Sequence, residues 1–282
     1  MFEIIEKEIL NPTVTRIKVS APAVARKAQP GQFIILRTDR DGERIPLTIA
    51  DYDPEEGTVT VIFQVVGATT ELLNTFEAGD SLADFVGPLG KPTDLGGIQS
   101  AAVVGGGVGC AIALPIARAL KKQGARVDCI IGFRNRDLVI LEKEFLSSSD
   151  RLFLMTDDGT AGEKGLVTDA LKKQIEAGVK YDRVITIGPL IMMKFVCRLT
   201  KEYSIPTVAS MNPIMIDGTG MCGGCRLTVG GKVCFACVDG PDFDGHLIDF
   251  DEAINRSGMY RPFEKNAREK MCNLLKEAQN HD

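Results

Sequence analysis

Histidine is scarce in this sequence, and a continuous basic block is absent. The 282 residues include two histidines, His246 and His281, which are too few and too far apart to build a metal site, and we assign them no role. The 33 lysines and arginines are spread among 38 aspartates and glutamates, for a net charge of -5. Because nucleic-acid binding depends on clustered positive charge, this distribution argues against a nucleic-acid partner.

Signal-like and membrane-spanning segments are also missing. The N-terminal residues MFEIIEKEIL lack the basic and then apolar order of a secretory signal, so we expect a cytoplasmic protein. The uncharged run from Ala101 to Ala117 approaches the length of a membrane span, but it contains Gly105, Gly106, Gly107 and Gly109 directly after a strand-like AAVV. Glycines at this density end a helix early, so we expect no membrane segment.

Turn residues and hydrophobic periodicity divide the chain into three predicted domains. Residues 1–97 contain short β-type runs separated by turns, which predicts an antiparallel barrel. Residues 98–205 alternate strand-like and helix-like runs, which predicts a parallel α/β sheet. Residues 206–282 are rich in glycine and cysteine, then acidic. They close on a predicted helix that packs on the body through apolar residues at helical spacing, namely Phe263, Ala267, Met271, Leu274 and Leu275.

A glycine-rich turn, GGGVGCA at residues 105–111, follows a strand-like run and opens a predicted helix. Backbone N–H groups at such a turn, with the positive end of the helix dipole, bind pyrophosphate. A tight turn without a ligand has the same pattern. Two more predicted strands end in glycine, at Gly132 and at Gly188-Pro189, on the edge where open α/β sheets bind ligands. Together these glycines favour a dinucleotide site over an empty turn.

Charged residues near this edge bear on the choice of nucleotide. Asp157 and Asp158 follow a predicted strand, and acidic side chains accept the ribose hydroxyls of NAD and repel the 2′-phosphate of NADP. Arg134 and Arg136 would act in the opposite sense, because guanidinium groups bind phosphate. We favour NAD(H), with a solvated loop as the alternative explanation of both pairs.

A second turn suited to phosphate lies within the predicted barrel. The segment GATTELL, residues 67–73, combines a glycine turn with a helix start at which Thr69 or Thr70 is the cap. A plain helix cap would have the same sequence, so this segment alone leaves the ligand open.

Several segments together resemble a known family. PGQF (30–33), IPLTIAD (45–51), GATTELL and GPLG (87–90) precede GGGVG, TDDG, KGLVTD (164–169) and IGPLIMMK (187–194). This series resembles the ferredoxin-NADP reductase superfamily over nearly the whole chain. It is most similar to the electron-transfer branch that contains the iron-sulfur subunit of dihydroorotate dehydrogenase and the small subunit of NADH-dependent ferredoxin:NADP oxidoreductase. The resemblance implies a barrel that binds FAD and an α/β domain that binds the nicotinamide nucleotide.

The resemblance also implies which residues contact the flavin. It places Pro46, Leu47 and Thr48 beside the flavin ring, and Gly67, Thr69 and Thr70 at its phosphates. One motif departs from the family. When its Arg-x-aromatic-Ser/Thr pattern is aligned on Thr48, Ile45 stands at the arginine position and Leu47 replaces the aromatic. Arg44 lies one residue earlier, and a one-residue slip turns a side chain to the other face of a strand, which weakens its assignment as a phosphate ligand.

Four cysteines lie close together in the segment MIDGTGMCGGCRLTVGGKVCFAC, residues 215–237. Cys222, Cys225, Cys234 and Cys237 form two CxxC pairs, which indicate metal binding in a chain without a secretory signal. One interpretation is a structural zinc ion held by four thiolates, although the eight-residue spacer is shorter than in the usual zinc ribbon.

The alternative interpretation is a [2Fe-2S] cluster with the plant-type spacing C-x4-C-x2-C and a distant fourth ligand. Counting back from Cys222 puts Asp217 at the first position, so the predicted ligands are Asp217, Cys222, Cys225 and Cys237, and Cys234 is spare. Four glycines lie within residues 218–224, where cluster sulfurs need backbone donors. An aspartate in the first position resembles the small subunit of the ferredoxin:NADP oxidoreductase, whereas the dihydroorotate dehydrogenase subunit has cysteine there.

The other cysteines, Cys110, Cys129, Cys197 and Cys272, lie in apolar contexts, and we expect them to be small buried hydrophobic residues.

Electron counting orders the implied cofactors. A nicotinamide releases two electrons as a hydride, a [2Fe-2S] cluster accepts one at a time, and a flavin converts between them. Hydride transfer needs no acid-base side chain, so we assign no catalytic residue. The resemblance implies a larger partner subunit with another FAD and [4Fe-4S] clusters, in a heterodimer or higher assembly that links NADH, NADPH and ferredoxin by electron bifurcation. The alternatives are the electron-transfer subunit of NAD-dependent dihydroorotate dehydrogenase and a zinc-stabilised interaction module.

Overall fold

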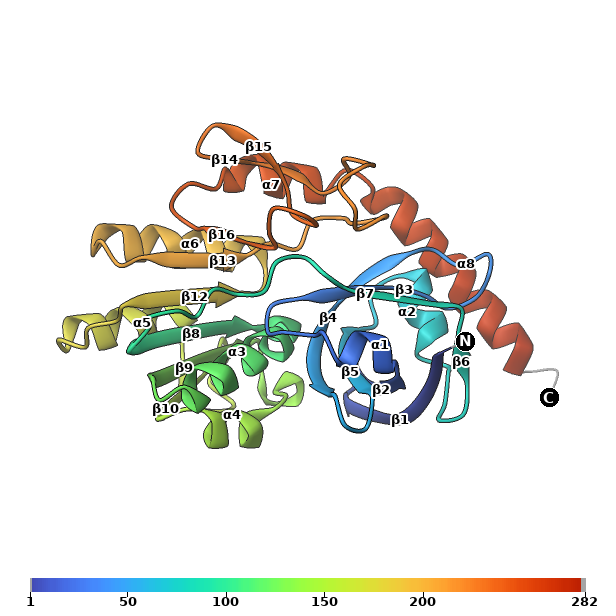
Figure 1. The fold of residues 1–282 in the computed structure, drawn as a ribbon, viewed down its shortest axis with the longest axis horizontal. Helices are drawn as coiled ribbons and strands as arrows, with labels where there is room; N and C mark the ends of the chain where they lie inside the picture. Colours follow the sequence, from blue (N-terminus) through green and yellow to red (C-terminus); the bar gives the residue numbers. More distant parts are fainter. Residues whose placement is uncertain (1, 280–282) are drawn as a thin grey trace.

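The computed structural model describes residues 2–279 and contains two large sheets and one small hairpin (Figure 1). The first sheet is antiparallel, with the order β6-β1-β2-β5-β4-β3-β7. Its strands are β1 (Phe2–Asn11), β2 (Val14–Ser20), β3 (Phe33–Arg37), β4 (Ile45–Asp53), β5 (Thr58–Gln64), β6 (Ser81–Leu82) and β7 (Asp84–Leu89). The two edge strands, β6 and β7, are separated in the chain by Ala83 alone, so the sheet curls into a nearly closed barrel. The predicted barrel is confirmed.

The barrel interior is filled by alternate residues of its strands. Ile17, Val19, Ile34, Leu36 and Phe63 are buried and pack together. Helix α1 (Pro22–Ala25) follows β2, and helix α2 (Ala68–Leu73) follows β5. The opposite face of β3, which carries Phe33 and Ile35, belongs to a separate apolar cluster outside the barrel.

The second sheet has the order β11-β10-β9-β8-β12-β13-β16 and is parallel except for β16. Its strands are β8 (Ser100–Gly106), β9 (Arg126–Phe133), β10 (Arg151–Thr156), β11 (Glu163–Lys164), β12 (Arg183–Ile187), β13 (Thr207–Ser210) and β16 (Asp242–Asp244). The connections contain η1 (Gly107–Gly109), α3 (Cys110–Lys122), η2 (Arg136–Leu138), α4 (Glu142–Ser148), α5 (Val167–Glu176) and α6 (Leu190–Glu202). The chain runs outward from β8 to β10 and then returns to β12 on the other side, which makes β8/β12 the topological switch point.

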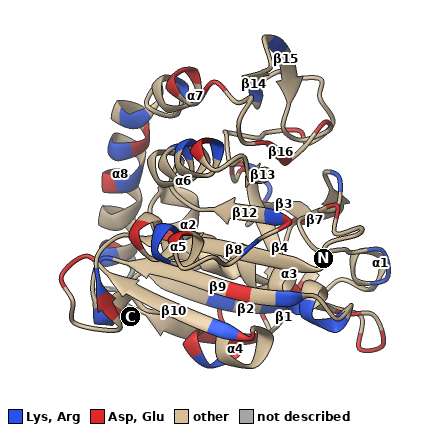
Figure 2. Ribbon diagram, turned by 90° about the vertical axis from the view of Figure 1, so that its left-hand side faces the viewer, with Lys and Arg blue, Asp and Glu red and all other residues tan. Residues whose placement is uncertain are grey.

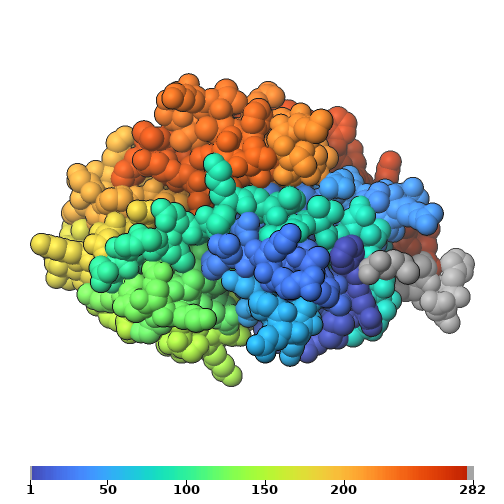
Figure 3. All heavy atoms as spheres, in the orientation of Figure 1, coloured from blue at the N-terminus to red at the C-terminus, as the bar shows by residue number. Residues whose placement is uncertain are grey.

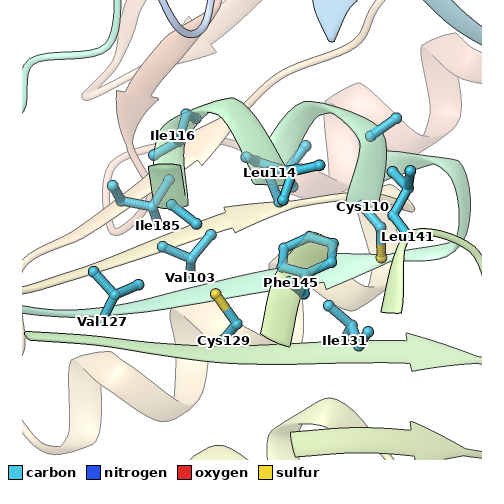
Figure 4. Close-up of a cluster of buried hydrophobic side chains, with 14 of the residues drawn as sticks. Val103, Cys110, Leu114, Ile116, Val127, Cys129, Ile131, Leu141, Phe145 and Ile185 are labelled. Carbon is cyan, nitrogen blue, oxygen red and sulfur yellow. The ribbon is translucent and has the colours of Figure 1, made fainter. Parts of the chain in front are cut away.

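Helices cover both faces of this sheet. On one face, side chains of α3 and α4 pack against β8, β9 and β12 around the buried Phe145 (Figure 4). Cys110 and Cys129 lie within this cluster, and burial raises the pKa of both thiols. Cys197 is also buried with a raised pKa, so these three cysteines are inert hydrophobic residues, as expected.

The C-terminal region lies across both sheets, as Figure 3 shows for the orange surface. It contains the hairpin of β14 (Arg226–Val229) and β15 (Lys232–Phe235), helix α7 (Phe250–Ser257) and helix α8 (Arg261–Gln279). Its core joins Cys225 and Cys237 to Phe33 and Ile35 of the barrel and to Met193 of α6. One apolar cluster therefore connects all three predicted domains.

One predicted domain boundary lies between the two large sheets, and the other lies within the parallel sheet. The boundary after residue 97 lies between β7 and β8. The boundary after residue 205 lies before β13, and both β13 and β16 are hydrogen-bonded into the parallel sheet. The sheet thus extends into the segment predicted as 206–282, and the division into three domains stays a prediction.

The predicted C-terminal helix is present as α8 and packs on α2 of the barrel. Arg268 forms an ion pair of 2.7 Å with Glu71 of α2. Met271 and Leu275 lie on a partly buried face, as expected, but Phe263 is 73% exposed and Leu274 is 59% exposed. The prediction that these two residues pack was wrong, because the contact face of the helix is narrower than its apolar pattern.

From the sequence we expect neither a membrane segment nor a continuous basic block. Within residues 2–279, no helix has the length and apolar content needed to cross a bilayer, and the run from Ala101 to Ala117 forms β8 and most of α3. Basic and acidic residues are interspersed over the ribbon in Figure 2. Of the two histidines, His246 lies 3.0 Å from the Thr200 hydroxyl, and His281 lies outside the described residues.

Candidate functional site

The loops that follow β8 and β12 touch one another at the switch point. A Cβ on Gly109 would lie 2.6 Å from the Ile187 carbonyl oxygen and 2.7 Å from the Gly188 Cα. A Cβ on Gly106 would lie 2.3 Å from the Met192 sulfur. Gly188 has a φ of 154°, which favours glycine, and it precedes Pro189 at the start of α6. Gly106 and Gly109 therefore meet Gly188, and their lack of side chains allows the approach, whereas Gly132 packs against Val167 of α5.

Gly107 differs from its neighbours in this turn. Its φ is +55°, and a Cβ built on it would have no atom within 4 Å. The turn is thus open at Gly107, directly before the N-terminus of α3, which is 13 residues long. Such an end presents unpaired N–H groups to an anion, so the surroundings fit the phosphates of a dinucleotide.

The four charged residues predicted to choose the nucleotide lie on neighbouring loops. The backbone N–H of Asp157 donates to Phe133, and that of Asp158 donates to Arg134, which holds the ends of β9 and β10 together. The Thr160 hydroxyl and backbone N–H donate to the Asp158 carboxylate and lower its pKa. Arg136 donates to the Thr160 carbonyl. All four residues are exposed, but Asp158 and Arg136 are engaged with Thr160, whereas the side chains of Asp157 and Arg134 have no hydrogen bond within residues 2–279.

The predicted flavin-ring residues lie at the start of β4. Pro46 pairs with Ile35 of β3, and Thr48 pairs with Phe33. Since Phe33 and Ile35 face the cluster outside the barrel, Pro46 and Thr48 share that outer face. Leu47 has the opposite orientation and packs against the barrel interior. The outer surface at this point is therefore formed by Pro46 and Thr48.

The predicted phosphate turn of the barrel forms the first turn of α2. The Thr70 hydroxyl accepts the Val66 and Gly67 N–H groups at 3.0 Å and 2.9 Å, so it caps the helix. The Thr69 hydroxyl donates to Glu43 at 3.1 Å, which brings the entry to β4 beside α2. Gly67 has an extended backbone, and a Cβ on it would meet nothing within 4 Å. No protein contact explains the glycine, which fits a position that faces a ligand.

Arg44 precedes both flavin segments in the sequence, and its side chain is held by other residues. Its Nε donates to the carbonyl oxygen of Ile216 at 2.9 Å. Its Nη1 lies 3.7 Å from the Asp84 carboxylate. The structure therefore places Arg44 against the residue that precedes Asp217.

Two of the predicted metal ligands already lie together. The sulfurs of Cys225 and Cys237 are 3.3 Å apart, both residues are buried, and neither forms a disulfide. Burial and the Cys225 thiol raise the pKa of Cys237. The Cys237 thiol therefore stays protonated without a metal, and metal binding would have to displace its proton.

The other two predicted ligands share a loop that depends on glycine. The Asp217 carboxylate accepts the N–H of Thr219 at 2.9 Å and that of Cys222 at 2.7 Å. These backbone donors lower the pKa of Asp217 and keep it ionised, and the Thr219 N–H has the larger effect. Residues 218, 220 and 223 are glycines with φ between 67° and 83°. A loop with these dihedrals turns its N–H groups inward, as an anionic sulfur site requires.

Cys234 stands apart from these groups. It lies on β15 opposite Leu227, with which it shares a face of the hairpin. Leu227 is buried in the apolar cluster of the C-terminal region. The ligand set, with Cys234 as the spare cysteine, stays a prediction.

The donor arrangement distinguishes the two metal hypotheses. Within residues 2–279, no three side chains of His, Cys, Asp or Glu converge on one point. A structural zinc ion needs four donors around a single centre. A [2Fe-2S] cluster has two irons that are ligated separately, so paired donors suffice. The adjacent thiols of Cys225 and Cys237 fit one iron of such a group, and Asp217 lies in the same loop as Cys222.

One buried polar contact at this site was absent from the sequence predictions. The Thr93 hydroxyl donates to Asp242 at 2.6 Å, which joins the segment after the barrel to β16. Burial raises the pKa of Asp242, and its other carboxylate oxygen is buried without a hydrogen-bond partner. The acidic composition of residues 239–251 gave no signal that one of these carboxylates is buried.

Comparisons with known proteins agree with this geometry. The iron-sulfur cluster binding domain of dihydroorotate dehydrogenase B matches residues 212–249, which include all four predicted ligands. A Thermotoga maritima homologue of the dihydroorotate dehydrogenase B electron transfer subunit is 45% identical over 277 residues, covering 98% of both chains. This chain belongs to that family of electron transfer subunits. The Fusobacterium nucleatum subunit is 31% identical and covers 80% of this chain and 89% of its own.

A solved structure extends the agreement to the fold. The structure described for flavin-based electron bifurcation by NADH-dependent reduced ferredoxin-NADP oxidoreductase is similar with a TM-score of 0.92. It is 43% identical and covers 96% of this chain and 98% of that chain. As an electron transfer subunit, the chain combines the ferredoxin reductase-like barrel and α/β sheet with an iron-sulfur binding region, as the sequence predicted.

Proposed function

We propose that this electron transfer subunit passes electrons between NAD(H), FAD and a [2Fe-2S] cluster in an electron-bifurcating ferredoxin:NADP oxidoreductase. One observation carries the choice of complex, namely the 43% identity with the ferredoxin-NADP oxidoreductase structure over 96% of the chain. The dihydroorotate dehydrogenase B relatives are 31% identical for the Fusobacterium nucleatum subunit and 45% for the Thermotoga maritima homologue, so they also fit the alternative complex. Asp217 at the first ligand position supports the ferredoxin:NADP oxidoreductase.

FAD would lie on the outer face of the barrel. Pro46 and Thr48 line that face, and Leu47 supports it from the barrel interior. The open backbone at Gly67 and the first turn of α2, with Thr69 and Thr70, would receive the phosphates. The Glu43 to Thr69 hydrogen bond holds these two segments side by side.

The nicotinamide nucleotide would lie across the switch point of the parallel sheet. Residues 105–109 would receive its phosphates, and Gly188 with Pro189 forms the other wall. We propose NAD(H) as the preferred nucleotide, because exposed Asp157 would accept ribose hydroxyls and repel a 2′-phosphate. Arg134 would be the residue that allows some NADP(H) to bind.

The cluster would be held by Asp217, Cys222, Cys225 and Cys237. The sulfurs of Cys225 and Cys237, which are 3.3 Å apart, would bind one iron. Asp217 and Cys222 would bind the other iron. The carboxylate is already ionised through its backbone donors. A hard oxygen ligand in place of a thiolate would change the cluster potential.

Strand β3 connects the flavin and cluster sites. Ile35 pairs with Pro46, and its side chain would lie 3.3 Å from a Cβ on Gly218. The flavin face and the cluster loop are thus neighbours on one barrel wall, inside an apolar cluster that excludes water. When bound, FAD supplies an acceptor for hydride from NADH and a donor of single electrons to the cluster. The chain's own residues position these centres, and none has to move a proton.

The partner would be a larger subunit with its own FAD and [4Fe-4S] clusters. The name of the family, electron transfer subunit, supports the presence of a partner subunit. Eight cysteines are present in this chain, and four lie away from the cluster segment, three of them buried as inert hydrophobic residues. The additional clusters would therefore belong to the partner. We further propose a cytoplasmic location, because reduced cysteine ligands suit a reducing compartment.

Anaerobic co-purification from the native host tests this function. We expect the chain to retain FAD and two irons and to bring down a larger flavin and [4Fe-4S] subunit. Recovery of a dihydroorotate-oxidising subunit instead would move the assignment to dihydroorotate dehydrogenase B, which the match at residues 212–249 also accommodates. A colourless chain that contains zinc and no flavin would reject both.

A further inference from the structure

Arg44 is held by the cluster loop in this structure, although it is the arginine nearest to the position at which the family pattern has a flavin-phosphate ligand. Its Nε donates to the Ile216 carbonyl at 2.9 Å across 172 residues of sequence. The side chain is 34% exposed, and Asp84, which lies 3.7 Å away, also pairs with Arg37 at 2.8 Å. A single guanidinium thus contacts both the barrel and the C-terminal region.

The neighbouring residue Glu43 shows why the Arg44 side chain points toward the cluster loop. Glu43 contacts Thr69 of α2, on the side of the predicted phosphate turn. Arg44 points instead to Ile216. Glu43 and Arg44 lie in the connection just before β4, and their contacts point to different elements, so an arginine at position 44 carries its charge to the loop and not to the phosphate turn.

Other contacts fix the same loop to the barrel. A Cβ on Gly218 would lie 2.6 Å from Leu89 Cδ1, so the loop backbone rests directly on β7. Met215 is buried in the cluster that contains Ile35. Asp217 lies between the carbonyl held by Arg44 and the glycine that rests on Leu89. Its position is therefore set by the barrel as well as by its own loop.

We propose that Arg44 is a positioning residue for the [2Fe-2S] loop and no ligand of the flavin phosphates, an inference that rests on the proposed function. Arg44 orients residues 216–222 through the Ile216 carbonyl and places a positive charge one residue from the Asp217 ligand. A nearby cation stabilises the reduced cluster, which carries the additional negative charge. Loss of Arg44 would therefore lower the cluster potential and leave flavin binding intact.

Arg44→Met and Arg44→Lys in the complete chain test this role, with Arg40→Met as the matched control. Arg40 is an exposed arginine in the same connection between β3 and β4. The readouts are FAD per chain, iron per chain, the cluster midpoint potential by redox-titrated EPR, and hydrogen exchange of residues 216–222. We expect Arg44→Met to keep FAD, shift the midpoint to a more negative value and speed exchange in the loop several-fold. Arg44→Lys should lie between it and the parent, and Arg40→Met should match the parent.

Loss of FAD from Arg44→Met with an unchanged cluster potential would overturn the proposal and restore the phosphate-ligand role. An Arg44→Met chain identical to the parent in all readouts would also overturn it, as would a shift of equal size in Arg40→Met. If Arg44→Met does not fold, the more conservative Arg44→Lys still separates flavin loss from a potential shift. Failure of the proposed function is recognised separately, because the unmodified chain would then lack flavin or iron.

Discussion

The thiol sulfurs of Cys225 and Cys237 lie 3.3 Å apart in the same apolar cluster as Ile35 of the barrel wall. The two cysteines are 12 residues apart in the sequence. They lie close together because the antiparallel hairpin of β14 and β15 brings the chain back to its starting point. The Ala236 N–H donates to the Cys225 carbonyl at 3.2 Å and fixes this return. The hairpin therefore brings two of the predicted ligands together, and the glycine loop carries the other two predicted ligands, Asp217 and Cys222.

The first prediction concerns the fourth ligand. Asp217→Cys should keep a [2Fe-2S] spectrum with a shifted midpoint potential, because a thiolate replaces a carboxylate. Cys234→Ser should keep both the spectrum and the potential of the parent, since Cys234 lies opposite Leu227 in the hairpin. Redox-titrated EPR and iron analysis measure both. An unchanged potential in Asp217→Cys, together with cluster loss in Cys234→Ser, would show that Cys234 is the ligand.

A second prediction uses two glycines with opposite surroundings. Gly67→Ala should leave the free energy of unfolding of the flavin-free protein within about 1 kcal/mol of the parent, because a Cβ there meets nothing within 4 Å and the backbone is extended. Its FAD affinity should fall, because the methyl group occupies the space of the phosphates.

Gly109→Ala is the matched contrast. Its Cβ would lie 2.6 Å from the Ile187 carbonyl oxygen, so the flavin-free protein itself should lose about 1–3 kcal/mol. Urea unfolding measures stability, and flavin fluorescence measures FAD release. Unchanged FAD affinity in Gly67→Ala would place the flavin phosphates elsewhere.

A third prediction concerns pH and a buried ion pair in the α/β sheet. The Asp128 side chain is 0% exposed and accepts hydrogen bonds from Arg151 at 2.9 Å and 2.5 Å and from Tyr181 at 2.6 Å. Burial alone would raise the pKa of Asp128, but Arg151 and then Tyr181 lower it overall. The pair therefore contributes stability above the unfolded pKa of about 4, and this is lost as pH falls through the lower folded pKa.

Arg151→Met should reverse this dependence. It leaves a buried carboxylate without its main partner, which should cost about 3 kcal/mol at pH 7. The pKa of Asp128 should then exceed its unfolded value, so that the variant becomes less stable as pH rises from 4 toward neutrality. Arg126→Met is the control, because Arg126 is 47% exposed and 3.5 Å from Asp128, and it should cost at most about 1 kcal/mol. Urea unfolding between pH 4 and pH 8 measures both variants, and parallel pH profiles for Arg151→Met and the parent would contradict the assignment.

A fourth prediction concerns nucleotide preference. Asp157→Ser should weaken NADH binding and improve NADPH binding several-fold, because the exposed carboxylate no longer repels a 2′-phosphate. Arg134→Ala should weaken NADPH binding and change NADH binding little. Dissociation constants from flavin-reduction titrations give the ratio of the two nucleotides. A ratio unaffected by Asp157→Ser would mean that the adenosine ribose lies away from this loop.

The sequence was most informative where local spacing determines structure. Alternation in the first 97 residues predicts the barrel, and the repeated strand-helix interval predicts the parallel sheet, because both patterns follow from burial on one or two faces. The ligand spacing from Asp217 to Cys237 lies within one loop and hairpin, so counting residues was sufficient to propose it.

Other features depend on contacts between distant segments. The partner of Arg44 is 172 residues away, and the motif that would have located it is displaced by one residue. Strand β16 pairs antiparallel with β13 at the edge of a parallel sheet, so the predicted boundary at residue 205 does not coincide with the edge of the sheet. Phe263 and Leu274 satisfy the helical period but remain exposed, because α8 contacts the short helix α2 and has no broad surface to cover.

The central claim is that one chain holds a flavin and a two-iron cluster that exchange electrons. Anaerobic mixing of the purified chain with NADH, followed by absorption and freeze-quench EPR, tests it most directly. We predict that flavin absorbance bleaches first and that the signal of a reduced [2Fe-2S] cluster then appears, with one electron per chain. Flavin reduction without any cluster signal, in a chain that contains iron, would contradict the account.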